Sequence, residues 1–304
     1  MATTGFAGTP AADRGGPRAP LRHLVPHAQV DASAEVRVST LLGLLEQAAI
    51  EASTDVGLDP CWYAAAGRMW IVRRTRIERG HPVGGGDLLE VRTRVLDWRR
   101  ARSLRGYEIR LAAPGRGTRE APLPQASDGG PPIVATAVTD WVFCDVVRGR
   151  PVRIPGEVVA AFAGDGAAAS LPRPDTPAAP GGGAVETRLL VRPSHVDHLG
   201  HANNAVWADF LEDAARMLPA ERDEEKEPSQ RLRRIVSLDV EYLAEASPGD
   251  EIEVASAPAG YRRVAQEVRR GDTPLVRAML AWGSARRSSI LGGPPTPTGD
   301  AADA

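Results

Sequence analysis

Cysteine, aromatic residues, long apolar runs and net charge are all scarce in this 304-residue chain. The two cysteines, Cys61 and Cys144, cannot build a disulfide framework, so two reduced thiols are expected. No apolar run of about 18 residues occurs, which argues against a membrane-spanning helix. The N-terminus also lacks the charged start and apolar core of a signal peptide. A formal net charge of −2 gives no overall basic field for nucleic acid. Together these absences predict a cytoplasmic protein.

Composition and length predict two domains joined by a linker. Apolar residues make up 42% and charged residues 25%, as in globular proteins. Residues 1–20 and 289–304 are rich in glycine, proline and alanine, and we expect them to be disordered tails. Residues 163–184 end in PGGGA and predict a linker. The two units are then 21–162 and 185–288.

The two units repeat each other, which we infer from segments that match in the same order. The aligned pairs are Val30-Asp31 with Val196-Asp197 and residues 45–49 with 211–215 at offset 166, Ile71-Val72 with Ile235-Val236 at offset 164, and Gly86-Asp87 with Gly249-Asp250 and residues 98–100 with 261–263 at offset 163. Such internal self-similarity indicates one structural unit used twice.

Each unit shows a short strand, one long helix and then several strands. Apolar residues at helical spacing predict helices over 39–54, capped by Ser39 or Thr40, and over 203–217, capped by Asn203 or Asn204. Short strands at 24–28 and 185–191 precede them, and the later segments alternate polar and apolar residues as antiparallel strands do. The predicted fold class is α+β.

The segment 195–204, HVDHLGHANN, concentrates polar residues just before the second helix. Amide groups at the start of a helix stabilise negative charge, and Asp197 or His201 could act as base or nucleophile in an acyl transfer. Two other interpretations remain. The histidines and Asp197 could bind a metal, although no second ligand cluster follows. Alternatively, the segment could be a structural polar turn.

The string Asp-x-x-Gly-His-x-Asn-Asn-x-x-Trp, followed by FLEDAAR, resembles the signature of hotdog-fold thioesterases. It is similar to the 4-hydroxybenzoyl-CoA thioesterase group and to the acyl-acyl-carrier-protein thioesterases, which fuse two hotdog units. The resemblance implies two tandem hotdog units, each a long helix wrapped by an antiparallel sheet. It also implies that Asp197, His201 and Glu245 are catalytic, and it implies no cofactor or metal. Asn203 is a candidate for a catalytic amide, and the backbone at Gly200 for the oxyanion site.

This sequence departs from the acyl-carrier-protein family where Leu199 replaces the expected asparagine. In the first unit, His201 corresponds to Glu35 and Asn203-Asn204 to Arg37-Val38, while offset 164 aligns Glu245 with His81. Only Asp31 keeps the residue type of Asp197. We therefore expect a single chemical site, in the second unit, with the first unit enclosing the acyl chain.

The resemblance predicts hydrolysis of acyl-acyl-carrier protein to free fatty acid, in fatty acid biosynthesis. An acyl-CoA thioesterase is the first alternative, and a non-catalytic acyl-binding hotdog protein the second. Clusters of strand arginines, such as Arg73, Arg74 and Arg76, could dock an acidic carrier protein or the phosphates of CoA, or could simply be solvated strand faces. Because hotdog units pair, the assembly could be a homodimer, or the two fused units could pair internally.

Overall fold

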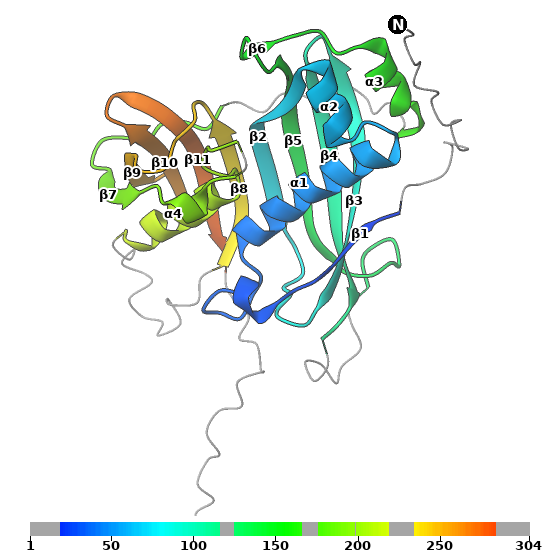
Figure 1. Cartoon of the computed structure of the whole chain (residues 1–304). Coiled ribbons are helices and arrows are strands. Elements are labelled where there is room, and N and C mark those ends of the chain that lie inside the picture. The colour runs from blue at the N-terminus through cyan, green and yellow to red at the C-terminus, as the bar shows by residue number, and fades with distance from the viewer. Residues whose placement is uncertain (1–18, 116–124, 166–175, 198, 219–233, 284–304) are drawn as a thin grey trace, which may run out of the picture.

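Eleven strands and four α-helices form the part of the chain that the computed structural model describes, residues 19–115, 125–165, 176–197, 199–218 and 234–283 (Figure 1). The tail 289–304, all but the last two residues of the tail 1–20, and nearly half of the predicted linker lie outside these ranges. The unit boundaries therefore stay a prediction. None of the helices within the ranges is long and apolar enough to cross a membrane.

Both units contain the same elements in the same order, which confirms the α+β fold class. The first unit consists of β1 (Leu21–Leu24), α1 (Val38–Asp55), β2 (Arg68–Arg79), β3 (Leu88–Arg99), β4 (Arg102–Ala113) and β5 (Ile133–Asp145). The second consists of β7 (Val185–Leu190), α4 (Val206–Arg216), β8 (Arg234–Tyr242), β9 (Glu251–Pro258), β10 (Arg263–Arg270) and β11 (Thr273–Gly283). The first unit adds α2 (Pro60–Ala66), β6 (Arg150–Pro151) and α3 (Gly156–Ala161).

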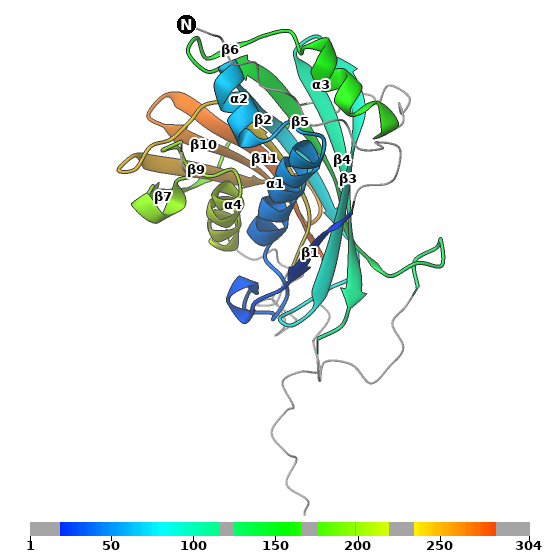
Figure 2. The same cartoon turned by 45° about the vertical axis from the view of Figure 1, so that its right-hand side comes forward.

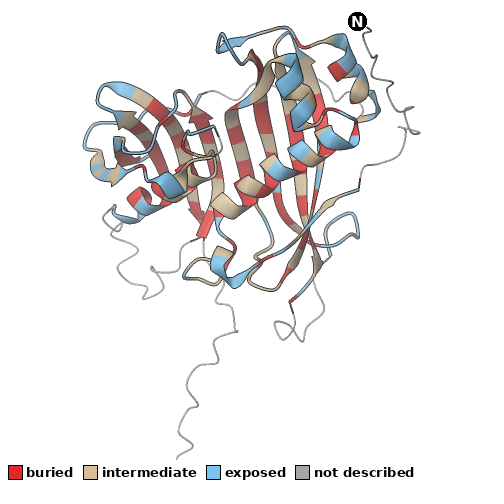
Figure 3. Ribbon diagram, in the orientation of Figure 1, coloured by how far each residue is buried: buried red, intermediate tan, exposed pale blue. Residues whose placement is uncertain are grey.

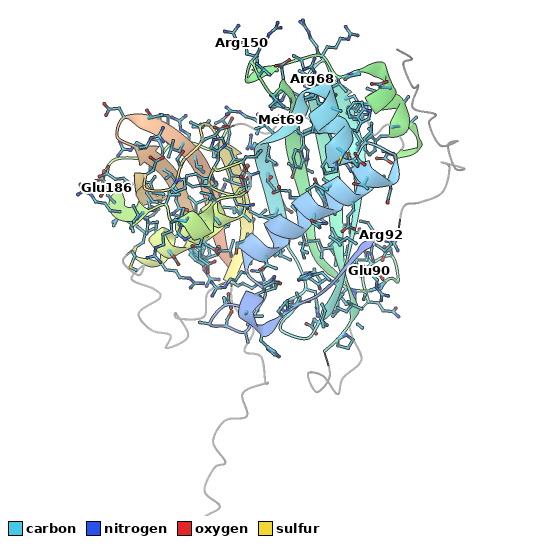
Figure 4. All side chains as sticks on the ribbon, in the orientation of Figure 1. Arg68, Met69, Glu90, Arg92, Arg150 and Glu186 are labelled. Carbon is cyan, nitrogen blue, oxygen red and sulfur yellow. The ribbon has the colours of Figure 1, made fainter. Side chains whose placement is uncertain are left out.

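One antiparallel sheet runs through both units, in the order β1-β3-β4-β5-β2-β8-β11-β10-β9-β7, with β6 paired to β5. The units join where β2 pairs with β8, and Arg76 lies opposite Asp239 at the centre of this seam. Figure 4 labels Glu186, on β7, and Glu90, on β3, toward the two ends of the sheet. The long helices α1 and α4 cover the same face of it (Figures 1 and 2).

A β-bulge at the same place in both units fixes their alignment. Arg73 is skipped where β2 pairs with β5, and Val236 is skipped where β8 pairs with β11. These two bulged residues are 163 positions apart. The offset of 164 predicted for this stretch is therefore wrong by one residue. Arg76 and Asp239, also 163 apart, are equivalent residues facing each other, so the seam has local two-fold symmetry.

The corrected alignment changes the counterpart of Glu245. In the second unit, the Ala202 N–H donates to the Ala246 carbonyl at 2.8 Å, and the first unit has the same bond between its equivalent residues, 36 and 83. Residues 83 and 246 are 163 apart. Glu245 therefore matches Pro82, and the prediction that it matches His81 is wrong.

The helices begin differently from the sequence prediction. Helix α1 starts at Val38 after Arg37, which makes no side-chain cap, so the predicted caps Ser39 and Thr40 lie inside the helix. Helix α4 starts at Val206, three residues later than predicted, and neither asparagine caps it. The first strand is also displaced, because β1 spans Leu21–Leu24 rather than 24–28.

The apolar stripes of α1 and α4 face the sheet and share one hydrophobic core, visible as the buried bands of Figure 3. The fully or nearly fully buried members include Leu41, Leu45, Trp207 and Leu211. Burying a side chain of this size stabilises the fold by about 1.5–3 kcal/mol. The stripes are therefore structural, and they hold both helices, with the loops that lead into them, against the seam.

Candidate active site

The signature segment forms a tight loop between β7 and α4. Val196 and Ala202 form an antiparallel bridge across it. The Asp197 N–H donates to the His201 carbonyl at 3.0 Å, and the Gly200 N–H donates back to the Asp197 carbonyl at 3.0 Å. Gly200 has φ of 80°, a conformation that a side chain disfavours. The first unit repeats these bonds at offset 166, so the loop itself belongs to the fold of both units.

The Asp197 carboxylate helps to fold this loop. Its Oδ1 accepts a hydrogen bond from the Leu199 N–H at 2.8 Å. Asp31, at the matching position, accepts the corresponding bond from the Ser33 N–H, also at 2.8 Å. The shared residue type therefore has a structural reason in both units. Any catalytic role of Asp197 comes in addition to it and stays a prediction.

His201 and Glu245, which are distant in the sequence, lie together in the structure. The His201 Nε2 is 3.2 Å from the Glu245 Oε2, and their side chains are 39% and 63% exposed. The bond between Ala202 and Ala246 holds the two chain segments at this distance. Because the pair is solvent-exposed, it contributes at most about 1 kcal/mol to stability. The pair can therefore take part in chemistry with little effect on the stability of the fold.

Backbone and side-chain groups expected to act on the substrate are partly engaged elsewhere. The Gly200 N–H, predicted to hold an oxyanion, donates to Asp197 instead. Asn203 directs its Oδ1 to the Ala205 N–H at 2.8 Å, so this oxygen shapes the entrance to α4. Within the described residues, the backbone N–H groups of Asn204 and Trp207 have no hydrogen-bond partner. They are the better placed donors at the start of α4.

A pocket lies between the signature segment and the first unit. Its empty volume is about 240 Å³, including space open to solvent. It is lined by Leu42, Leu45, Glu46, Val72, Thr75, Thr139, Trp141, Asn204 and Tyr242. Helix α1 and strands β2 and β5 supply most of this wall, whereas Asn204 and Tyr242 come from the second unit. The site is therefore shared between the units rather than confined to the second.

The polar groups of the pocket influence one another. The Tyr242 hydroxyl donates to the Asn204 carbonyl at 3.0 Å, which fixes the end of the signature segment against β8. Burial raises the pKa of Tyr242 above its ordinary value, and the negative charge of Glu46 raises it further. Burial also raises the pKa of Tyr107; the positive charge of Arg105 opposes it, and Glu46 makes the smallest contribution. Glu46 thus places a carboxylate near two protonated phenols.

The two-fold symmetry of the seam relates the pocket to a second location, which an ion cluster fills. The pocket residues Asn204, Tyr242, Thr75 and Thr139 are replaced there by Val38, Arg79, Leu238 and Leu280. Arg79 is almost fully buried, and its Nη2 lies 3.3 Å from the Glu35 Oε2. Arg234 approaches the same oxygen at 3.0 Å. Burial lowers the pKa of Arg79 to about 10. An ion cluster therefore occupies the second location, and the protein has two unlike half-sites.

The sequence prediction missed Glu46, Thr75, Thr139 and Tyr242. One signal was available, because Glu46 interrupts the apolar stripe of α1 and has a counterpart, Glu212, in α4. Glu212 pairs with Arg216 one helical turn later, at 3.0 Å. The residue one turn after Glu46 is Ile50, so this local pairing is not open to Glu46. For a metal, the described residues offer no group of three His, Cys, Asp or Glu.

Comparison with known proteins agrees with the fold. Residues 25–162 match the family model of the Thioesterase-like superfamily. The putative oleoyl thioesterase of Lactobacillus plantarum has a similar structure, with a TM-score of 0.70 at 19% identity, covering 88% of this chain and 95% of that one. The acyl-ACP thioesterase of Bacteroides thetaiotaomicron gives 0.69 at 18% identity, with 87% and 97% covered. The 12:0-ACP thioesterase of Umbellularia californica gives 0.66 at 18% identity, with 87% and 96% covered. No curated protein sequence matches the chain.

The family match covers the first unit, whereas the signature segment lies in the second. The structural likeness extends over both units and nearly the whole of each similar structure. At this level of identity the likeness establishes the fold, and the predicted pair of fused hotdog units is confirmed. Residues 25–162, somewhat less than half of the chain, match the family model of the Thioesterase-like superfamily, and the chain as a whole has the double hotdog fold of these similar structures.

Proposed function

We propose that this protein hydrolyses acyl thioesters at the pocket between the units, with an acyl-carrier protein as the carrier of the acyl group. The pocket is the observation that carries the proposal, because Glu46 and Asn204, just before α4, both line it. Two of the similar structures are named as acyl-ACP thioesterases, and both share the double hotdog arrangement. Their names support the choice of carrier.

In the proposed reaction, the thioester carbonyl lies at the start of α4. The N–H groups of Asn204 and Trp207 stabilise the oxyanion that forms when water attacks the carbonyl carbon. Glu46 or Asp197 takes the proton from the attacking water. Glu46 is the carboxylate that lines the pocket, and Asp197 lies in the signature segment, where its Oδ1 accepts from the Leu199 N–H. The carbon–sulfur bond then breaks, and the proton that the carboxylate took from water passes through His201, held by Glu245, to the departing thiolate.

Acyl-CoA is the second candidate substrate. It is favoured by Leu199, which departs from the acyl-carrier-protein pattern. Arg74 and Arg76 both bind Asp239, and Arg73 binds Glu241. Because these three arginines are already ion-paired, they do not distinguish a carrier protein from CoA.

A panel of acyl-CoA and acyl-carrier-protein thioesters, assayed for release of free thiol, tests the proposal. Hydrolysis of carrier-protein substrates that weakens as salt rises supports the proposed carrier. Faster hydrolysis of the CoA series would assign the second candidate. Release of no thiol from either series would contradict both and favour an acyl-binding protein.

The base is assigned with matched variants. Asp197→Asn keeps an oxygen for the Leu199 N–H, so the loop should still fold, and Asp31→Asn is the same change in the first unit. Glu46→Gln has its control in Glu51→Gln, on the same helix outside the pocket. Loss of the general base should lower kcat by about 100-fold or more. The assignment is wrong for either carboxylate whose variant falls no further than its control.

A further inference from the structure

The inner wall of the pocket carries two hydrogen-bonded pairs of side chains. The Trp141 Nε1–H donates to the Tyr107 hydroxyl at 3.2 Å. The Thr139 and Thr75 hydroxyl oxygens are 3.2 Å apart. Tyr107, Thr75 and Thr139 are buried. Both threonines line the pocket.

The threonine pair has a hydrogen to spare. Each hydroxyl supplies one hydrogen, so two hydrogens serve the single link between Thr75 and Thr139. One hydrogen is left over whichever way the hydroxyls turn. Among the residues that the structure describes, the two threonine hydroxyls have no further hydrogen-bond partner. The spare hydrogen therefore belongs to a threonine on the pocket wall.

The second unit shows that the fold itself does not need these hydroxyls. The positions of Thr75 and Thr139 are held there by Leu238 and Leu280, each fully buried. The same strands therefore pack well with purely apolar side chains at both places. A buried hydroxyl without a full set of partners costs about 1–3 kcal/mol. Because these hydroxyls occur in only one unit, and there at the pocket, they indicate a ligand that accepts the spare hydrogen bond.

We infer that the pocket selects acyl groups that carry a hydroxyl or oxo oxygen near the thioester carbonyl, and that Thr75 and Thr139 recognise this oxygen. The inference rests on the proposed function for the identity of the ligand as an acyl group. Thr75 lies opposite Val240, two residues before Tyr242 on β8. Two residues of strand span about 7 Å, so the hydroxyl pair is close to the carbonyl end of a bound chain.

Binding of free acids tests the inference without requiring turnover. Calorimetry compares β-hydroxydecanoic and β-oxodecanoic acid with decanoic acid, which has the same chain length. The oxygenated acids should bind the native protein roughly tenfold more tightly, the value of one added hydrogen bond. Thr75→Val combined with Thr139→Val removes both hydroxyls at nearly constant shape and should abolish this preference. Thr136→Val, on the exposed face of the same strand, should keep it.

The matching thioesters separate this inference from the proposed function. Hydrolysis of the oxygenated and plain decanoyl thioesters at equal kcat/KM, with equal binding of the acids, would overturn the selectivity alone. Selective binding of the oxygenated acids without hydrolysis would overturn the proposed function and leave the selectivity intact. A preference that survives in the double valine variant would overturn the role of the threonines. Binding of none of the three acids would overturn the inference as a whole.

Discussion

Asp239 at the centre of the seam offers a direct test of how the two units are joined. Its Oδ1 accepts from the Arg74 Nε at 2.7 Å and its Oδ2 from the Arg74 Nη2 at 2.6 Å, and Arg76 binds the same Oδ2 at 3.0 Å. The Asp239 and Arg74 side chains are only 17% and 12% exposed. Burial lowers the pKa of Arg74, but the hydrogen bonds and charge of Asp239 outweigh it, so the pKa is raised.

Asp239→Ala removes the carboxylate that binds two nitrogens of the partly buried Arg74, and leaves only the smaller charge contributions of Glu241 and Asp140 among those that raise its pKa. Breaking a buried pair costs about 3–5 kcal/mol, and the remaining exposure puts this case near the lower value, about 3 kcal/mol. Urea unfolding followed by circular dichroism measures the change in free energy of unfolding. The control is Glu253→Ala, which breaks the exposed pair between Glu253 and Arg188 and should cost below about 1 kcal/mol. A loss for Asp239→Ala as small as for the control would refute the reasoning.

Three further predictions concern the site and the thiols. Glu245→Gln should lower kcat at least tenfold. Because its pair with His201 is exposed, the free energy of unfolding should change by less than about 1 kcal/mol, as urea titration of the assayed sample would show. Gly200→Ala should destabilise the protein by about 1 kcal/mol in the same titration, since φ is positive there, whereas an unchanged value would mean that the loop adapts. Cys61 is exposed and should react with a thiol reagent at once. Cys144 is buried, which raises the pKa of its thiol, so it should react only after unfolding. Fast labelling of both thiols would contradict the structure.

The repeated architecture was predictable from the sequence because the repeat leaves a trace in apolar spacing and turn residues. Gly86-Asp87 and Gly249-Asp250 make the same turn, in which the aspartate accepts from the N–H three residues earlier at 2.8 Å in both units. Helix ends were predicted less well, since Ser39 or Thr40 would cap a helix locally but the apolar Val38 is drawn into the core. The one-residue error in offset came from matching Ile71-Val72 with Ile235-Val236 by residue type, whereas the bulges, which no local pattern reveals, align Arg73 with Val236.

For the candidate site, sequence reasoning predicted the partners of one loop but missed the wall facing it. His201 and Glu245 meet as the resemblance implied. Glu46 and Thr75 come from the other unit, and their proximity to Asn204 depends on how β2 pairs with β8. A pairing register between distant strands is set by tertiary packing, so the residues that it brings together cannot be read from spacing.

The seam between β2 and β8 has a consequence for how the two half-sites could differ. In a dimer of identical subunits, every substitution appears at both interfacial sites, so an ion cluster that closes one would close the other. Here the equivalent positions are different residues of one chain, so each can be substituted without changing the other. Arg79 can fill one location while Tyr242, its counterpart, shapes the opening at the other. Because the two units are fused, their equivalent half-sites need not have the same sequence. One half-site can therefore be closed by an ion cluster while the other stays open to a ligand.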